Sequence, residues 1–239
     1  MRDFSIILLV LIIWIETYAS GKISMGIMAG ASNDAGNISK IAGDINSEMR
    51  EYQIANSGTE VTEIETTYTP LVSLNFSFVK ESLLIKAGWE YTTNSFYKSS
   101  GSIQPSAGSE NKIELDYTRF TFPVSFGMVI PLTGRDRIYL GGGLNISYFL
   151  FKITQTDPGL LALYPDKSHT YSAFIGGTHV MCGAETVLSR NYSFTIEFTK
   201  FFGNPSKVQS EDENSEMYMS INSFEITAGI NYNINFKIL

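Results

Sequence analysis

The sequence is poor in charge, histidine and cysteine, and each shortage narrows what the protein can do. Charged residues make up 17% of the 239 residues, and the formal net charge is −7. Nucleic-acid binding is not expected, because phosphates require a basic surface. No run of lysine or arginine suggests attraction to anionic lipid headgroups. Metal-ligand clusters, phosphate-binding loops and dinucleotide-binding glycine motifs are also missing, so we expect no cofactor and no metal.

Cys182 is the only cysteine, so no internal disulfide can form. It does not follow the N-terminal apolar run, so it is not a lipid-attachment site. Its even-numbered neighbours are apolar or small, which predicts a structural thiol, either buried or facing lipid, rather than a nucleophile.

The one long apolar run, FSIILLVLIIWI, lies near the N-terminus and is followed by the small residues of ETYASG. It is too short for a spanning helix, which needs about 20 residues. A short charged start, an apolar stretch and a small-residue end predict a secretory signal peptide over residues 1–21. Cleavage after Ala19 or after Gly21 fits the pattern, and we favour Gly21. The alternative is an uncleaved anchor.

The rest of the chain is dominated by alternation between apolar and polar residues. In FEITAGINYNINFKIL (224–239), the even positions carry apolar side chains, all large except Ala228, and the odd positions up to Lys237 carry polar or small ones. Successive side chains of a strand point to opposite faces, so this segment has one apolar face and one polar face. It also runs well past the usual strand length of about 5–6 residues.

The same pattern recurs along the chain and predicts eight strands. They are expected over residues 22–31, 63–79, 83–97, 113–130, 137–154, 170–187, 191–202 and 218–238. The connections alternate between three short turns and long polar loops, the layout of an outer-membrane barrel. A soluble sandwich is the alternative, but it explains neither this asymmetry nor the many Phe, Tyr and Trp residues on the apolar faces. We therefore predict an all-β fold, an eight-stranded antiparallel up-and-down transmembrane β-barrel over residues 22–239.

One hairpin carries a family resemblance. The segment LDYTRFTFPVSFGMVIPLTGRDRIYLGGGLNISYFL (115–150) resembles the central hairpin of small outer-membrane β-barrel proteins of the Bacteroidetes type. Tyr117, Pro123, Tyr139 and Gly141–Gly143 stand where that pattern has a Pro-containing strand, a short periplasmic turn and a Gly-rich strand. The architecture is similar to the eight-stranded OmpA/OmpX-type barrels.

The resemblance covers roughly residues 22–239 and implies a fold, a location in the cell outer membrane of a Gram-negative bacterium, and barrel-assembly machinery as a partner. The chain ends in Leu239 rather than the terminal Phe common in such proteins, although Phe236 and Ile238 keep the alternation that the machinery reads. The family is heterogeneous in function.

Alternation also assigns side chains to the two faces of the predicted barrel. The expected lipid-facing residues are Phe122, Phe126, Ile146, Phe194, Phe198, Ile226, Ile230, Ile234 and Phe236. The expected lumen charge network is Lys86, Glu90, Arg119, His179, Glu185, Glu197 and Glu225. An eight-stranded barrel has an interior just wide enough for side chains to fill, so we expect these groups to plug the lumen. A narrow polar path is the alternative.

Groups suited to catalysis are sparse. Hydrolysis needs a nucleophile, a base and an orienting acid held together. His169 and Ser168 are adjacent and so point to opposite faces, whereas His179 and Glu185 share a face about 20 Å apart. The acidic run SEDENSE (210–216) is either solvated or a site for divalent cations. The segment INSEMREYQIA (45–55) predicts a short helix in the first loop.

These observations lead to one expected function and two alternatives. We expect an integral outer-membrane barrel that acts as a structural or surface-interaction scaffold through four long extracellular loops, and not an enzyme. The alternatives are a narrow channel or secretion- or transport-accessory barrel, and, less favoured, a lipid-modifying enzyme. Expected partners are outer-membrane lipid, the barrel-assembly machinery and an unidentified surface or periplasmic protein.

Overall fold

The structure is a computed structural model that describes residues 21–33, 37–66, 68–95, 99–157, 168–210 and 217–236. The predicted signal peptide therefore lies outside the described residues, apart from Gly21. The acidic run at 210–216 also lies outside them, apart from Ser210. In the described part of the chain, no helix has the length and apolar character needed to cross a membrane.

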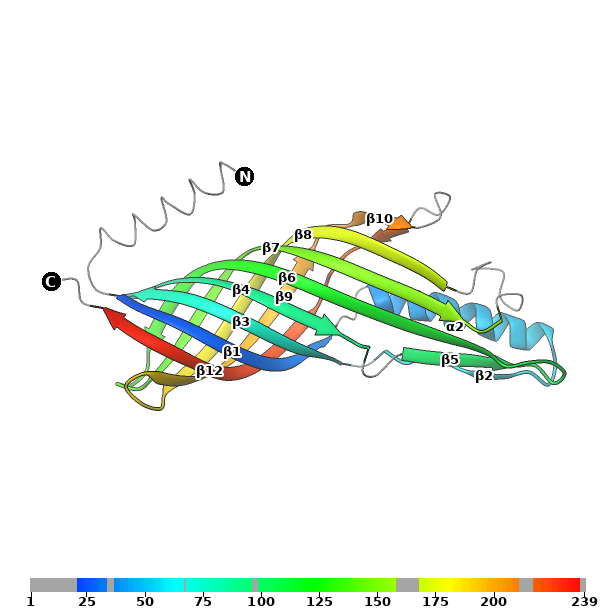
Figure 1. The fold of residues 1–239 in the computed structure, drawn as a ribbon, viewed down its shortest axis with the longest axis horizontal. Coiled ribbons are helices and arrows are strands. Elements are labelled where there is room, and N and C mark those ends of the chain that lie inside the picture. The colour runs from blue at the N-terminus through cyan, green and yellow to red at the C-terminus, as the bar shows by residue number, and fades with distance from the viewer. Residues whose placement is uncertain are drawn as a thin grey trace.

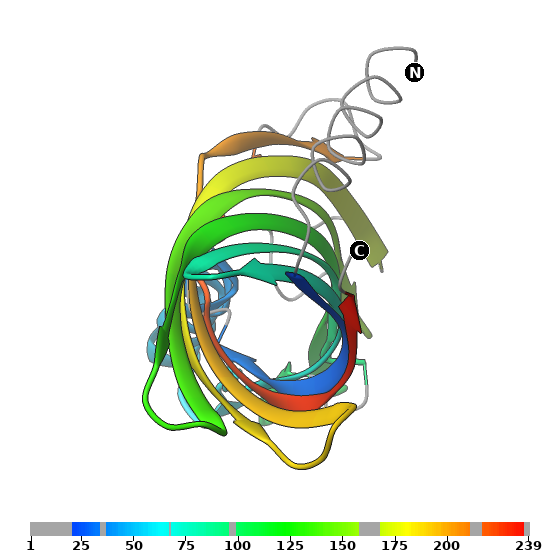
Figure 2. The same ribbon diagram turned by 90° about the vertical axis from the view of Figure 1, so that its left-hand side faces the viewer.

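Eight strands form a closed ring in which every neighbouring pair is antiparallel. The ring is formed by β1 (Gly21–Asn33), β3 (Thr69–Lys80), β4 (Leu83–Thr93), β6 (Asn111–Pro131), β7 (Asp136–Gln155), β8 (Ser168–Val187), β9 (Tyr192–Gly203) and β12 (Phe224–Phe236). Pairing between β1 and β12 closes it, as the view along the barrel in Figure 2 shows. The predicted eight-stranded antiparallel up-and-down barrel is confirmed.

The strands are staggered around the ring. A path that starts at Arg119 and steps through paired residues by way of β4, β3, β1, β12, β9, β8 and β7 returns to β6 at Val129, ten residues further along. Such a shear requires strands that tilt by about 35–45° from the barrel axis. Figure 1 shows this inclination. The stagger matters because it decides which inward side chains meet.

The two ends of the barrel differ. At the turn end, on the left in Figure 1, β1 begins, β12 ends, and short connections at 81–82, 132–135 and 188–191 join the strands. At the loop end lie helix α2 (Asn37–Ala55) and the short strands β2 (Glu60–Thr62), β5 (Ser99–Gln104), β10 (Ser206–Ser210) and β11 (Met217–Met219). These short strands lengthen the sheet formed by β6, β7 and β8 beyond the ring.

Three predicted strand boundaries were wrong at the loop end. The strand predicted over 218–238 starts at Phe224 as β12, and the other two differ for one shared physical reason. The strand predicted over 63–79 starts at Thr69, because the Asn46 side chain bonds both the N–H and the carbonyl of Ile64, at 2.8 and 3.0 Å. The strand predicted over 83–97 ends at Thr93, because the Asn94 side chain bonds the backbone of Leu115 and Tyr117. In both places an asparagine side chain replaces a ladder partner.

The outer and inner faces of the barrel wall exchange polarity along the strands. The outer face carries a band of apolar side chains, the apolar belt, formed by the outward-facing residues of 23–31, 70–78, 83–91, 120–130, 138–150, 174–184, 192–202 and 224–234. On β6 the outward side chains become polar from Phe120 to Thr118, towards the loop end, and the inward ones become apolar from Arg119 to Tyr117. Beyond the belt, the barrel therefore has the polar exterior and apolar interior of a water-soluble protein.

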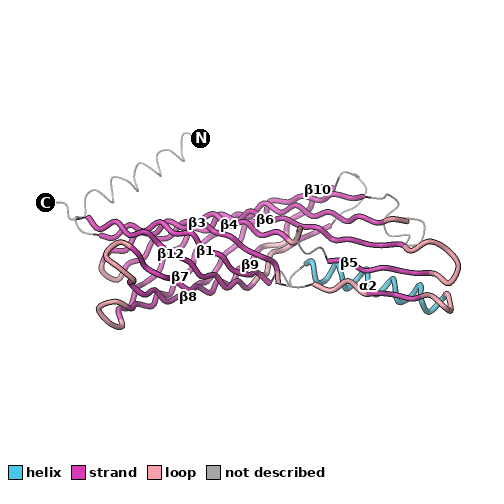
Figure 3. The backbone as a smooth tube through the Cα atoms, turned by 60° about the horizontal axis from the view of Figure 1, so that its bottom comes forward, coloured by secondary structure: helices cyan, strands magenta, loops and turns pink. Residues whose placement is uncertain are grey.

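Helix α2 fills the inside of this loop-end extension. Its buried residues, Ile38, Ile41, Ala42, Ile45 and Met49, form one stripe at helical spacing. The stripe belongs to an apolar core that includes Phe149, Phe151 and Ile153 of β7 and Ile175 of β8. The helix, cyan in Figure 3, runs beside the extended strands. The helix predicted over 45–55 is present and begins earlier, at Asn37.

Candidate functional site: the filled lumen

All seven residues expected in the lumen are buried inside the ring. Their exposed fractions are 9% for Lys86, 6% for Glu90, 1% for Arg119, 3% for His179, 7% for Glu185, 5% for Glu197 and 1% for Glu225. They come from five strands and lie at different heights. Charges at such depth require partners, since an unpaired buried ion is costly.

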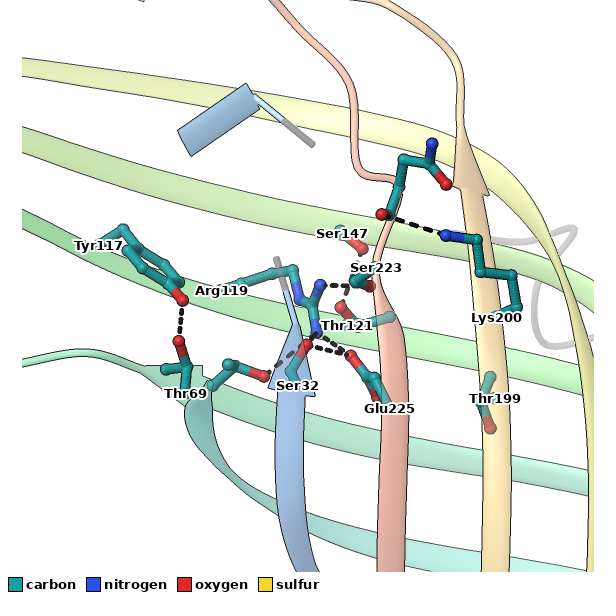
Figure 4. Close-up of polar contacts among 12 residues, drawn as sticks. Ser32, Thr69, Tyr117, Arg119, Thr121, Ser147, Thr199, Lys200, Ser223 and Glu225 are labelled. Atoms are coloured by element: carbon teal, nitrogen blue, oxygen red, sulfur yellow. Dashed lines mark hydrogen bonds and ion pairs between the residues drawn. The ribbon is translucent and has the colours of Figure 1, made fainter. Parts of the chain in front are cut away.

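Arg119 is the centre of the part of this network that lies nearest the loop end. Its guanidinium forms an ion pair with Glu225 and donates to the hydroxyls of Ser223 at 2.9 Å and Thr92 at 3.2 Å. Ser32 accepts from Arg119 at 3.3 Å and donates to Glu225 at 3.1 Å. Figure 4 shows these side chains converging from different strands. The guanidinium thus ties β6 to β1, β4 and β12, with the planar set of donors that arginine supplies.

Lys86 and Glu197 form a second ion pair nearer the turn end. Lys86 Nζ lies 2.5 Å from the Glu197 carboxylate, and the Tyr139 hydroxyl donates to the same carboxylate at 2.7 Å. Thr199 donates to it at 3.4 Å. The pair joins β4 to β9 across the lumen.

A third cluster at the turn end includes two cations that the sequence reasoning missed. Glu185 pairs with Lys22 at 2.6 Å and with Arg137 at 2.5 Å. These cations are more accessible than Arg119, with side-chain exposures of 16% and 17%. Strand alternation could have predicted both. Arg137 is two residues from the inward Tyr139, and Lys22 is two residues from the inward Ser24, so alternation places both side chains inside the barrel.

Glu90 belongs to the expected lumen charge network, but it makes no ion pair with Arg119 or Lys86. Both cations take other carboxylates, Glu225 and Glu197. Glu90 Oε2 is buried and has no hydrogen-bond partner among the described residues. Its strand neighbours are Ser73 on β3 and Thr121 on β6.

A serine–histidine pair also lies in the lumen. Ser125 Oγ and His179 Nε2 are 2.7 Å apart, although β7 lies between their strands. Gly143 of β7 pairs with both residues, and a Cβ there would lie 1.8 Å from the Val124 carbonyl oxygen. The pair was not predicted, because its members are 54 positions apart in the chain. Both residues are buried, at 2% and 3% exposure.

The lumen is filled in layers, and the outer layers differ from the expected polar plug. At the turn end, an apolar cluster of Val79, Leu84, Val129, Tyr139 and Met181 lies inside the wall. The polar network follows, and the apolar core around α2 closes the loop end. Near the turn end, Asn75, Lys86 and Glu185 help to line a cavity of about 30 Å³. A polar cavity of this size has room for at least one water molecule.

The residues expected to face lipid lie on the outer face. The exposed fractions are 53% for Phe122, 57% for Phe126, 60% for Ile146, 36% for Phe194, 39% for Phe198, 42% for Ile226, 54% for Ile230 and 48% for Ile234. Phe236 ends β12, and its side chain lies outside the described part. Cys182 is exposed on this face as a free thiol. Trp89 and Tyr192 are exposed here too, as aromatic residues at membrane boundaries often are.

Comparison of the sequence with protein-family models and with curated proteins gives no match. Comparison with solved structures does. A major outer membrane protein from Thermus thermophilus has a TM-score of 0.51 and 12% identity, over 90% of this chain and 99% of that one. OprG from Pseudomonas aeruginosa has a TM-score of 0.48 and 11% identity, over 90% and 96%. Ail, the attachment invasion locus protein of Yersinia pestis, has a TM-score of 0.44 and 9% identity, over 90% and 99%.

Sequence identities this low indicate similarity of fold and nothing more. Three observations support the same fold: the closed ring of eight antiparallel strands, the apolar exterior, and the similarity to the Thermus protein. The expected resemblance is therefore confirmed at the level of architecture: the chain has the fold of the small eight-stranded outer-membrane β-barrels.

Proposed function

We propose that this protein is an integral outer-membrane β-barrel whose lumen is closed, and that it acts as a structural or surface-interaction scaffold. The membrane location is supported by the apolar belt, which on β6 runs from Phe120 to Ile130. A tilted strand needs about 9–11 residues to cross the hydrocarbon core. Closure of the ring supports the same view, because a bilayer offers no partner to an unpaired strand edge.

The scaffold role is carried by one observation, the filling of most of the lumen by inward side chains of the described residues. Three ion-paired clusters occupy the ring, and the core around α2 closes it at the loop end. A barrel filled in this way supports a rigid surface rather than a pore. That surface is the loop-end extension, which we propose to face outward from the cell, since loops on rigid frameworks commonly carry binding function.

Conductance tests the closed state. Wild-type protein reconstituted in planar bilayers is expected to show no steady current, because ion-paired side chains leave so little room in eight strands. A stable channel whose ion selectivity changes in an Arg119→Gln variant would overturn the scaffold proposal. It would instead support a narrow channel, the candidate that the cavity near Lys86 and Arg137 favours.

We also propose that the protein has no enzymatic activity. The strongest candidate is the Ser125–His179 pair, and its side chains are enclosed between Gly143 and the opposite wall. His179 Nδ1 has no hydrogen-bond partner among the described residues, so no acid orients the ring. Hydrolysis of ester or phospholipid substrates that is lost on Ser125→Ala substitution would refute this.

The signal peptide and the engagement of barrel-assembly machinery stay predictions.

A further inference from the structure

The polar cavity near the turn end is bounded by charged side chains from different strands. Its volume is about 30 Å³, and its lining includes Lys86 of β4, Arg137 of β7 and Glu185 of β8. The Arg137 side chain is 17% exposed, so solvent at the turn end reaches this part of the lumen. Another part of the lining is apolar and is formed by Met28, Val79, Leu84 and Val129. A solute held here must therefore match the charged groups on the polar side.

Positive charge is in excess around this cavity. Glu185 pairs with Lys22 at 2.6 Å and with Arg137 at 2.5 Å, whereas Glu197 pairs with Lys86 at 2.5 Å. Among the described residues at the turn end of the lumen, three cations therefore share two carboxylates. A buried charge without a counter-charge is costly unless a ligand or water solvates it.

The carboxylate that balances the charge of the lumen lies elsewhere. Glu90 has no ion pair among the described residues, and on β4 it lies four positions from Lys86, towards the loop end. Four positions along a strand span about 13 Å. Glu90 is also not among the residues that line the cavity. The positive excess at the turn end is therefore local, and an anion is the ligand that would neutralise it.

The cations that line the cavity have N–H groups to spare. Lys86 Nζ lies 2.5 Å from each oxygen of the Glu197 carboxylate, which uses two of its three N–H groups. Arg137 has five N–H donors and uses one of them, on Glu185, within the described part of the chain. The Asn231 amide also lines the cavity, and it donates one of its two N–H groups to a threonine hydroxyl at 2.6 Å. Donors from three strands thus surround the cavity.

Asn75 is the buried side chain that points to a ligand. It is 5% exposed and lines the cavity, and its Oδ1 has no hydrogen-bond partner among the described residues. Its Nδ2 donates to Ser73 at 3.0 Å and to Met28 Sδ at 3.1 Å, and a thioether is a weak acceptor. A half turn of the amide exchanges its oxygen and nitrogen. The oxygen would then accept from the Ser73 hydroxyl, and an N–H donor would stand where the oxygen now lacks a partner.

We propose that this cavity, lined by Asn75, Lys86 and Arg137, binds a small monovalent anion such as chloride. The excess cation supplies the charge, and charge-assisted hydrogen bonds from Lys86 and Arg137 supply the contacts. An anion of a single atom fits a cavity of this size, whereas sulfate is too large for it. Entry from the turn end leaves the apolar core around α2 in place, so the site is compatible with a closed lumen.

The test uses the folded full chain in a zwitterionic detergent, with chloride titrated against gluconate at constant ionic strength. The line width of the chloride NMR signal measures binding, and wild type is expected to broaden the signal beyond detergent alone. Arg137→Gln should weaken chloride binding about tenfold, the usual effect of losing one charged hydrogen bond. Arg135→Gln is the matched control, because it removes the same charge from the exposed turn two residues earlier, and it should leave binding unchanged.

A second variant decides the matter if Arg137→Gln fails to fold, which the gel mobility of the unheated protein shows. Asn75→Asp keeps the shape of the side chain and places a carboxylate at the cavity, so chloride broadening should disappear. Equal broadening by wild type and Asn75→Asp would overturn the proposal.

Three other results would overturn it as well. Broadening by wild type that equals detergent alone would mean that the cavity holds water only. Equal weakening by Arg135→Gln and Arg137→Gln would indicate general attraction of anions to the turn end. Displacement of chloride by sulfate at constant ionic strength would mean that binding takes place outside the cavity, because sulfate does not fit inside it.

Discussion

Arg119 shows how much of this barrel depends on single side chains. It is among the largest fully buried residues, at 1% exposure, and its partners belong to strands that enclose the lumen from different sides. A buried ion pair does not necessarily stabilise a fold, because desolvation offsets attraction. Removal of one partner does destabilise the fold, since the other charge then stays buried without a counter-charge.

Arg119→Ala is therefore expected to lower stability by about 3–5 kcal/mol, less where water enters the lumen. The temperature at which the folded form converts to the unfolded form on gels measures the effect. Lys112→Ala is the control, because that side chain lies outside, half exposed beside Glu114. Arg119→Met/Glu225→Met should recover much of the loss, since no charge is left without a partner. Equal stability of Arg119→Ala and wild type would show that Glu225 is not dependent on this arginine.

A second prediction concerns Asp136, at the turn end and outside the apolar belt. Hydrogen bonds from Thr186 and Thr133 hold the pKa of its carboxyl below the ordinary value. A depressed pKa in the folded state adds stability above the unfolded pKa of about 3.9, and that stability is lost as pH falls through the folded value. Thr186→Val should raise the pKa of Asp136, measured by the NMR shift of its carboxyl carbon. Thr154→Val, at the loop end of β7, should leave the titration unchanged.

Among the elements, α2 depends most on its surroundings. Most of the stability of a helix in a protein comes from packing of its apolar face, so the apolar stripe of α2 must be covered. The inward faces of β7 and β8 supply the cover, because they change from polar to apolar where the barrel leaves the apolar belt. The helix and the extended strands thus form one small core on top of the ring.

The helix contains a matched pair of isoleucines that tests this account. Ile45 is buried at 2% exposure, whereas Ile54 on the same helix is 85% exposed. Ile45→Ala should cost about 2–5 kcal/mol through lost contacts and a cavity, and Ile54→Ala should cost almost nothing. Hydrogen exchange of the α2 amides measures the loss locally. Equal protection in the two variants would mean that the helix does not pack on the strands as described.

For the whole molecule, the proposed orientation places the loop end outside the cell and the turn end in the periplasm. In a Cys182→Ser background, cysteines at Ser106 and Ser47 should react with a membrane-impermeant reagent on intact cells. A cysteine at Thr133, in the turn between β6 and β7, should react only after lysis. All three positions are exposed, so accessibility differs only by the side of the membrane. The reverse pattern would invert the proposed topology.

Much of the architecture could be predicted because strand alternation is a local property. A period of two fixes which side chains face the same way, and parity alone assigned Arg119 and Glu225 to one face and Phe122 and Ile230 to the other. The loop-end boundaries could not be predicted so well. Asn46 and Asn94 replace backbone partners there, and those contacts involve residues 18 and 21 positions away.

The sequence by itself thus determined the number of strands in the ring, their two faces and the asymmetry of the connections. Tertiary structure alone decided which lumen charges meet, because closure with a shear of ten residues sets the height of every inward side chain. Arg119 and Glu225 are 106 positions apart, and no local pattern links them. The same geometry gave Glu185 two cations, whereas Glu90 has no ion pair among the described residues. It also brought side chains of β3, β4 and β7 to one cavity at the turn end, since cross-strand neighbours are fixed by register and not by distance along the chain.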